Sequence, residues 1–323
     1  MQKVLKALRI IYSKFIPPPK LPEPVCERDA EKASEMIHHL LSSDAPCMIA
    51  RFGNIELTTM VNYLGVHSEK RNIFKYIRSQ QIDWWWNEKL LSSMQSNAGF
   101  FPSTVDKIER FCELMMDDIK QVDILGSWVP QEYCFREYLS KAQKVQLCLL
   151  EPFYSVNPWS RALKGKNVLV VHPFAKTIEA QYKRRQFLFS NEDILPEFNL
   201  YTIPAVQSLG GETHGFSDWF EALQWMKDEI DKINYDICLI GCGAYGFPLA
   251  AHVKRQGKKA VHLGGSLQLL FGIRGKRWEN PNHGINDGVP PNFYVNLMND
   301  YWVRPDDGLK PPSADKVEGG CYW

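Results

Sequence analysis

Two short segments combine residue types that could bind a phosphorylated ligand. Arg51-Phe-Gly-Asn-Ile-Glu56 supplies a guanidinium group, a glycine, an amide and a carboxylate, and Gly241-Cys-Gly-Ala-Tyr-Gly246 fits the pattern G-x-G-x-x-G. Each follows a short apolar run and precedes a segment with helical periodicity. We therefore expect each to be a loop that leaves a strand and enters a helix. In open α/β sheets, such loops bind ligands at the carboxyl ends of the strands.

The glycine-rich segment predicts a phosphate-binding turn at a helix N-terminus, where backbone N–H groups favour negative charge. We expect Gly241, Gly243, Tyr245 and Gly246 to contact the phosphate or ribose of a nucleotide. A dinucleotide enzyme would also carry an acidic residue at the end of the next strand. That strand ends in Val261-His-Leu-Gly-Gly265, without an acid, which disfavours NAD. A turn needed only for close helix–strand packing is the alternative.

A basic loop, Gly272-Ile-Arg-Gly-Lys-Arg-Trp278, follows the glycine-rich segment. Its cations suit a diphosphate whose negative charge grows as it leaves. These cations are Arg274, Lys276 and Arg277. The alternative is a solvated charged surface.

Several side chains are candidates for acid–base chemistry or metal binding. Glu56 and Asn54 could place oxygen ligands on a Mg²⁺ or Mn²⁺ ion that bridges phosphates, although Glu56 could instead form an ion pair with Arg51. His172 and His262 lie at the ends of predicted strands. Each could be a general base, a hydrogen-bond donor to phosphate or a hydrogen-bonded loop residue. Two further acid–base candidates, Glu212 and His214, lie in the polar run Gly210-Gly-Glu-Thr-His-Gly215. We expect this run to form a loop that covers the site.

Composition narrows the classes of protein. The chain has 323 residues, 45% of them hydrophobic, and a net charge of +1. That balance argues against a nucleic-acid binder. The eight cysteines include no C-x-x-C pair and no zinc spacing, so we expect reduced thiols and a cytoplasmic protein.

The first 24 residues predict a basic amphipathic helix followed by a proline-rich spacer. On a helical wheel, most apolar residues between positions 4 and 16 share one face, and the cations share the opposite face. Such a helix could contact an anionic membrane peripherally through residues 3–16. The alternative is a helix docked on the body of the protein or on a second subunit.

The remaining sequence alternates strands and helices, which predicts an α/β, Rossmann-like, mostly parallel sheet with helices on both faces. A helical insertion after the first strand is expected at about residues 72–120. We expect an α/β domain over 25–279 and an irregular, aromatic-rich tail over 280–323 that packs on it. The predicted strands are Cys47–Ala50, Val122–Leu125, Val145–Leu150, Asn167–Val171, Leu200–Ile203, Asp236–Ile240 and Ala260–Leu263.

These motifs resemble a known family. Arg51–Glu56 is similar to the Arg-Phe-Gly-Asp-x-Glu element of GT-D-type glycosyltransferases, which are bacterial enzymes of glycan assembly. Gly241–Pro248, His262–Gly265, the Gly272–Trp278 loop and the ending Lys316–Trp323 resemble polysaccharide-biosynthesis proteins related to that group. The resemblance spans most of the chain.

The resemblance implies a nucleoside-diphosphate-sugar donor, with a UDP-sugar favoured, and Mn²⁺ or Mg²⁺ at the Asp-x-Glu pair. Glu56 matches the family's glutamate, whereas Asn54 stands where its aspartate should be. An amide brings no charge, so metal affinity should be weaker and metal dependence stays open. Arg51 and Gly53 would belong to the nucleotide- or diphosphate-binding set.

The expected function is sugar transfer to a surface glycan of capsule or O-antigen type, on a lipid-linked acceptor at the cytoplasmic membrane face. The alternatives are an NAD(P)-type oxidoreductase and a non-catalytic scaffold of a glycan-assembly complex.

Overall fold

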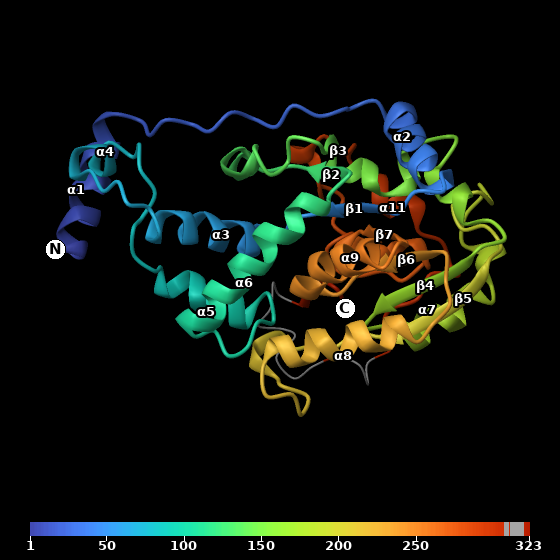
Figure 1. The fold of residues 1–323 in the computed structure, drawn as a ribbon. Helices are drawn as coiled ribbons and strands as arrows, with labels where there is room; N and C mark the ends of the chain where they lie inside the picture. Colours follow the sequence, from blue (N-terminus) through green and yellow to red (C-terminus); the bar gives the residue numbers. More distant parts are fainter. Residues whose placement is uncertain (307–309, 311–319) are drawn as a thin grey trace.

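The computed structural model describes residues 1–306, 310 and 320–323. Its centre is a seven-stranded sheet in the order β3-β2-β1-β7-β6-β4-β5, in which every neighbouring pair is parallel (Figure 1). The predicted Rossmann-like α/β fold is confirmed. The strands are β1 (Cys47–Arg51), β2 (Ile124–Ser127), β3 (Gln143–Gln146), β4 (Asn167–His172), β5 (Asn199–Pro204), β6 (Ile237–Ile240) and β7 (Lys259–His262).

One strand prediction is wrong in its second half. The apolar run after β3 does not extend the strand, because Leu147–Leu150 forms a 3-10 turn. This turn brings Leu150 over β2, where a side chain on Gly126 would lie 2.4 Å from the Leu150 Cδ1 atom. The run is apolar because it caps the edge of the sheet.

Successive side chains of the inner strands enter two separate cores, whereas the edge strands β3 and β5 are partly exposed. Met48 and Ala50 of β1 face one core, and Cys47 and Ile49 face the other. Two-sided burial explains why these strands are continuous apolar runs. The first core contains residues of α3 (Asn54–Val66), α5 (Glu88–Ser96), α6 (Val105–Asp118), α8 (Trp219–Asp231) and α9 (Gly246–Arg255). The second contains residues of α2 (Ala30–Ser42), α7 (Ala175–Tyr182) and α10 (Leu267–Leu270).

The predicted helical insertion is confirmed. Helices α3, α4 (Ile73–Ile77), α5 and α6 lie between β1 and β2 in the sequence. In Figure 1 the insertion extends away from the sheet, with α4 at its far end beside α1 (Gln2–Phe15).

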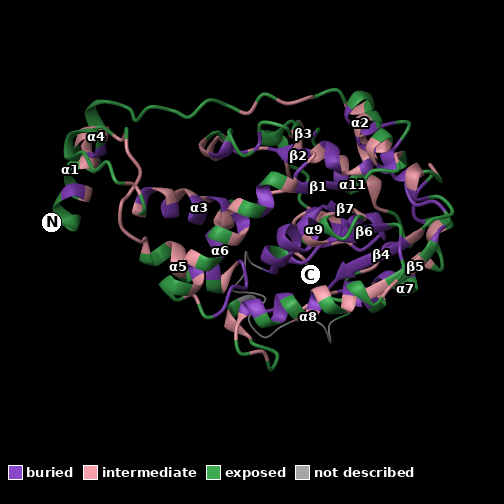
Figure 2. Ribbon diagram, in the orientation of Figure 1, coloured by how far each residue is buried: buried purple, intermediate pink, exposed green. Residues whose placement is uncertain are grey.

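Helix α1 packs on the insertion through one edge. Leu5 is buried, and the Arg9 Nη1 atom lies 3.0 Å from the Asp83 Oδ1 atom. The Arg9 guanidinium carbon also lies 4.8 Å from the Tyr76 ring centroid. The apolar stripe of α1 faces outward, so most of the helix is exposed in Figure 2. Its exposed members are Val4, Leu8, Ile11 and Phe15.

The tail contains α11 (Phe293–Leu297), a 3-10 turn at Ile285–Asp287 and irregular segments. Its aromatic side chains Tyr294, Trp302 and Trp323 are buried in the second core, as expected of a packed tail. Of the ending that resembles the polysaccharide-biosynthesis proteins, 316–319 lies outside the described residues. All eight cysteines are free. None of the described helices is long and apolar enough to cross a membrane.

Candidate functional site

A pocket of about 470 Å³ lies at the carboxyl ends of four neighbouring strands, and we call it the central pocket. The loops that follow β1, β7, β6 and β4 all contribute to its wall. The chain leaves β4 toward the edge strand β5, whereas it leaves β6 toward β7. This reversal is the topological switch point at which open α/β sheets bind ligands. The predicted site residues in its lining are Arg51, Gly53, Asn54, Glu56, His172, Gly241, Gly243, Tyr245, His262 and Arg277.

Arg51, at the end of β1, and Glu56, in the first turn of α3, both line the central pocket. Helix α3 begins at Asn54, and the Glu56 carboxylate lies back over Gly53, where a Cβ atom would be 1.9 Å from the Glu56 Oε2 atom. The Arg51 guanidinium carbon lies 5.2 Å from the ring centroid of Trp128, which follows β2. A side chain at position 53 would therefore displace the Glu56 carboxylate from its place over Gly53.

The three glycines of the G-x-G-x-x-G segment have different roles. The Gly241 N–H donates to the Val171 carbonyl at 2.9 Å, so it is already bonded within the sheet. Gly243 has a φ of +55°, a conformation that favours glycine, and lines the pocket. Gly246 lies under the His262 ring, where a Cβ atom would be 2.1 Å from the Cε1 atom. The packing alternative therefore applies to Gly246, which is absent from the described lining of the pocket.

Tyr245 is fixed by its neighbours. Its ring stacks on Trp219 at a centroid distance of 4.9 Å, and its hydroxyl lies 2.7 Å from the Ser208 Oγ atom. Ser208 donates its own proton to the Gly99 carbonyl, so Tyr245 is the donor in this bond. The tyrosine shapes the pocket wall through its buried ring.

His172 and His262 are buried and line the central pocket. The Phe174 N–H donates to His172 Nδ1 at 3.0 Å, so neutral His172 carries its proton on Nε2. His262 Nδ1 lies 3.3 Å from the Ile240 carbonyl and must donate to it, which leaves Nε2 as an acceptor. Burial lowers the pKa of both imidazoles to about 3, and the Arg51 charge adds to the effect at His262.

The fold places only one of the three cations of the basic loop in the described lining of the central pocket. Arg277 lines the central pocket, its Nη2 atom 3.0 Å from Cys321 Sγ and its guanidinium carbon 4.9 Å from the Tyr322 ring centroid. Arg274 and Lys276 are outside the described linings of the two large pockets, and Lys276 is exposed. Glu212 is also outside both linings, 3.7 Å from His214 Nε2.

The oxygen donors of the central pocket fit a cation that takes most of its ligands from a substrate. Glu56 supplies one carboxylate and Asn54 one amide, both at the N-terminus of α3. Mg²⁺ commonly binds one or two carboxylates together with phosphate oxygens and water. Within the described part of the chain, no three His, Cys, Asp or Glu side chains form a group that could hold a metal ion. A metal ion here would therefore depend on a bound substrate or water for further ligands.

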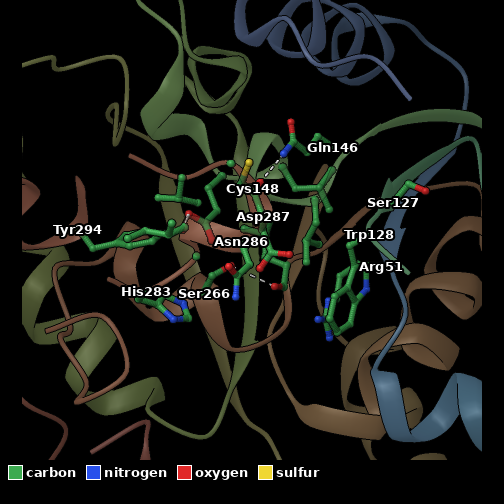
Figure 3. A pocket seen from close by; sticks show the side chains of 18 of the residues that line it. Arg51, Ser127, Trp128, Gln146, Cys148, Ser266, His283, Asn286, Asp287 and Tyr294 are labelled. Atoms are coloured by element: carbon green, nitrogen blue, oxygen red, sulfur yellow. Dashed lines mark hydrogen bonds between the residues drawn. The ribbon is translucent and has the colours of Figure 1, made fainter. Parts of the chain in front are cut away.

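A second pocket, which we call the lateral pocket, has a volume of about 520 Å³ and lies beside the first. Figure 3 shows Arg51 and Trp128 on one side of it and Tyr294 and His283 on the other. Its lining includes the carboxyl group of Glu151, a residue not predicted from the sequence, which follows the apolar run after β3. The sequence feature that could have identified Glu151 is its position directly after the predicted strand Val145–Leu150.

A model of the GT-D fold-like domain matches residues 28–270. The chain belongs to the GT-D-like family. The matched range includes all seven strands and the loops after β1 and β6, and it ends before Arg277 and the tail. The family assignment agrees with the resemblance in Arg51–Glu56, and it indicates a glycosyltransferase-like fold. No match was found among curated proteins or solved structures.

Proposed function

We propose that this GT-D-like protein transfers a sugar from a nucleoside-diphosphate sugar, with a UDP-sugar favoured, to a glycan acceptor. The observation that carries the proposal is the central pocket itself. Its described lining holds two guanidinium groups, Arg51 and Arg277, but one carboxylate, Glu56, at the N-terminus of the 13-residue helix α3. Cations and a helix N-terminus together favour a diphosphate.

The charged and histidine side chains of the central pocket each have a role in this proposal. Arg51 and Arg277 hold the diphosphate and neutralise the charge that develops on it as the sugar leaves. His172 donates from Nε2 to an oxygen of the donor, and His262 accepts from a hydroxyl or amide. Glu56 binds donor hydroxyls or a divalent cation. When bound, such a cation would add further stabilisation of the diphosphate charge.

The proposed acceptor is a surface glycan or its lipid-linked precursor, of capsule or O-antigen type. The exposed apolar stripe of α1, formed by Val4, Leu8, Ile11 and Phe15, supports a peripheral contact with the inner face of the cytoplasmic membrane. No acidic residue precedes Glu23, so the helix also attracts anionic headgroups. Such a contact would keep the enzyme near a lipid-linked acceptor.

Thermal unfolding of the purified protein with UDP, GDP, CMP or NAD, each with Mn²⁺ and with EDTA, tests the donor class. A ligand at a hundredfold excess over its dissociation constant stabilises the protein by about 2.7 kcal/mol. We expect stabilisation by one nucleoside diphosphate and none by NAD. Stabilisation by NAD alone would favour the oxidoreductase, and no effect of any nucleotide would favour the scaffold.

A further inference from the structure

The lateral pocket opens beside the reaction centre and shares a wall with the central pocket. Arg51, Trp128, Gly265, Arg277 and Tyr322 line both. Two ligands bound one in each pocket would therefore meet at these side chains. In the central pocket this wall is the part that we assign to the departing diphosphate.

The chemistry of the lateral pocket suits a carbohydrate. Its lining combines polar side chains with the faces of aromatic rings, which together match the hydroxyl groups and apolar faces of a sugar. The tail closes one side, where the Gln146 side-chain amide donates to the Asp287 carbonyl. The polar groups include Gln146, Ser266, His283, Asn286 and Asp287, and the rings include Trp128, Tyr294 and Tyr322.

Glu151 is held at the wall of this pocket by a chain of hydroxyl groups. The Tyr294 hydroxyl donates to Glu151 Oε2 at 2.8 Å, and the Tyr154 hydroxyl donates to the Tyr294 oxygen at 3.0 Å. Tyr154 is fixed in turn by stacking on Phe293 at a centroid distance of 4.2 Å. The carboxylate is therefore oriented before any ligand binds.

The groups around Glu151 set its affinity for a proton. Burial raises the pKa of Glu151 to about 7. The hydrogen bonds from Tyr294 and Ser266 and the positive charge of Arg51 act in the opposite direction and lower this pKa. A carboxylate whose pKa lies near neutrality can accept a proton from a substrate far better than an exposed glutamate can.

We propose that the lateral pocket binds the carbohydrate acceptor and that Glu151 is the general base of the transfer. This inference rests on the proposed function. The acceptor hydroxyl gives its proton to a Glu151 oxygen while the acceptor oxygen forms a bond to C1 of the donor sugar. The bond between C1 and the diphosphate oxygen breaks, and its electron pair leaves with the nucleoside diphosphate beside Arg51 and Arg277. One displacement of this kind inverts the configuration at C1.

The experiment uses hydrolysis of UDP-glucose, UDP-galactose or UDP-N-acetylglucosamine, whichever the wild-type protein cleaves, with water in place of the acceptor. We expect Glu151→Gln to lower kcat by about 10²–10⁴-fold, because the amide cannot accept the proton. The amide oxygen can still accept from Tyr294, so the stabilisation by UDP should not change. The hydrolysis rate of the wild type should rise as the pH is raised toward neutrality, and the rate of the variant should not. Proton NMR should show the inverted anomer of the released sugar first.

Asp118→Asn is the matched control for loss of a buried carboxyl. Burial raises the Asp118 pKa to about 6, Asp118 pairs with Arg255, and it lies outside the described linings of both pockets. We expect this variant to keep its kcat within about twofold, as for a group that touches no substrate. A Glu151→Gln protein that retains at least a third of the wild-type kcat, or release of the retained anomer, overturns the inference alone. A wild-type protein that neither binds nor cleaves any nucleotide overturns the proposed function and this inference together.

Discussion

His172 and His262 both line the central pocket, and they differ in the atom that remains for a further hydrogen bond: Nε2 of neutral His172 is a donor, and Nε2 of His262 is an acceptor. The backbone fixes this difference, because His172 Nδ1 accepts from the Phe174 N–H and His262 Nδ1 donates to the Ile240 carbonyl. Two residues of one type, on strands separated by β6, are thus chemically distinct. Neither is a base at neutral pH in the free protein, since the pKa of each is lowered to about 3.

The buried histidines predict acid sensitivity. Between the unfolded-state pKa and about pH 3, the unfolded chain binds a proton at each position while the folded protein does not, so stability falls as pH is lowered through this range. One such histidine costs about 2 kcal/mol at 1.5 pH units below its unfolded-state pKa. His262→Asn keeps a donor for the Ile240 carbonyl and cannot titrate. Its unfolding free energy should fall less than that of the wild type between pH 7 and pH 5. An identical fall in urea titrations would contradict the assignment.

Arg277 is the cation of the basic loop that lines the central pocket. Arg277→Ala should weaken UDP binding by roughly 10–100-fold, because hydrogen bonds to charged groups contribute about 1.5–3 kcal/mol. Lys276→Ala removes the neighbouring charge, which lies outside the described pocket linings, and should alter the affinity less than about twofold. Isothermal titration calorimetry with UDP compares the two variants. Equal losses would show that the loop acts only through its net charge.

Asn54 should limit metal dependence. Asn54→Asp adds a second carboxylate beside Glu56 and should raise the ratio of activity in Mn²⁺ to activity in EDTA by about tenfold, a change of about 1.4 kcal/mol. Asn97→Asp adds the same charge elsewhere in the lining of the central pocket and serves as the control. A ratio that Asn54→Asp leaves unchanged, or that Asn97→Asp raises equally, would argue against a cation at this position.

The outward stripe of α1 predicts binding to anionic membranes. Leu8→Ser with Phe15→Ser should weaken binding to phosphatidylglycerol vesicles by at least tenfold, since burial of each side chain contributes about 1.5–3 kcal/mol. Both side chains are exposed, so the melting temperature should not change. Vesicle cosedimentation measures the binding, with phosphatidylcholine vesicles as the reference for charge. If the wild type is instead a dimer that the substitutions dissociate, the stripe is a contact between two copies of the chain.

The sequence was sufficient to predict the sheet because its inner strands are buried on both faces. Runs such as Asn167–Val171 have few other ways to bury their side chains, and their order placed Arg51, Gly241 and His262 at one edge. Periodicity did not distinguish a strand from a compact turn over Leu147–Leu150, since a short apolar run is compatible with either.

The shared wall was beyond sequence reasoning. Trp128, Arg277 and Tyr322 are distant in the chain and meet only because the tail folds back on the sheet. The bond between Arg277 and Cys321, the stacking on Tyr322 and the division of the basic loop are tertiary features, and no local pattern encodes them.

A wall that belongs to two pockets also makes their occupants thermodynamically interdependent. Any movement of Arg51, Arg277 or Tyr322 that one ligand imposes reshapes the binding surface of the other. The coupling is reciprocal. If a bound nucleotide changes the affinity for a saccharide by some factor, a bound saccharide changes the affinity for the nucleotide by the same factor. In the proposed reaction, a ternary complex of the protein with both substrates would form around the four shared side chains, those of Arg51, Trp128, Arg277 and Tyr322.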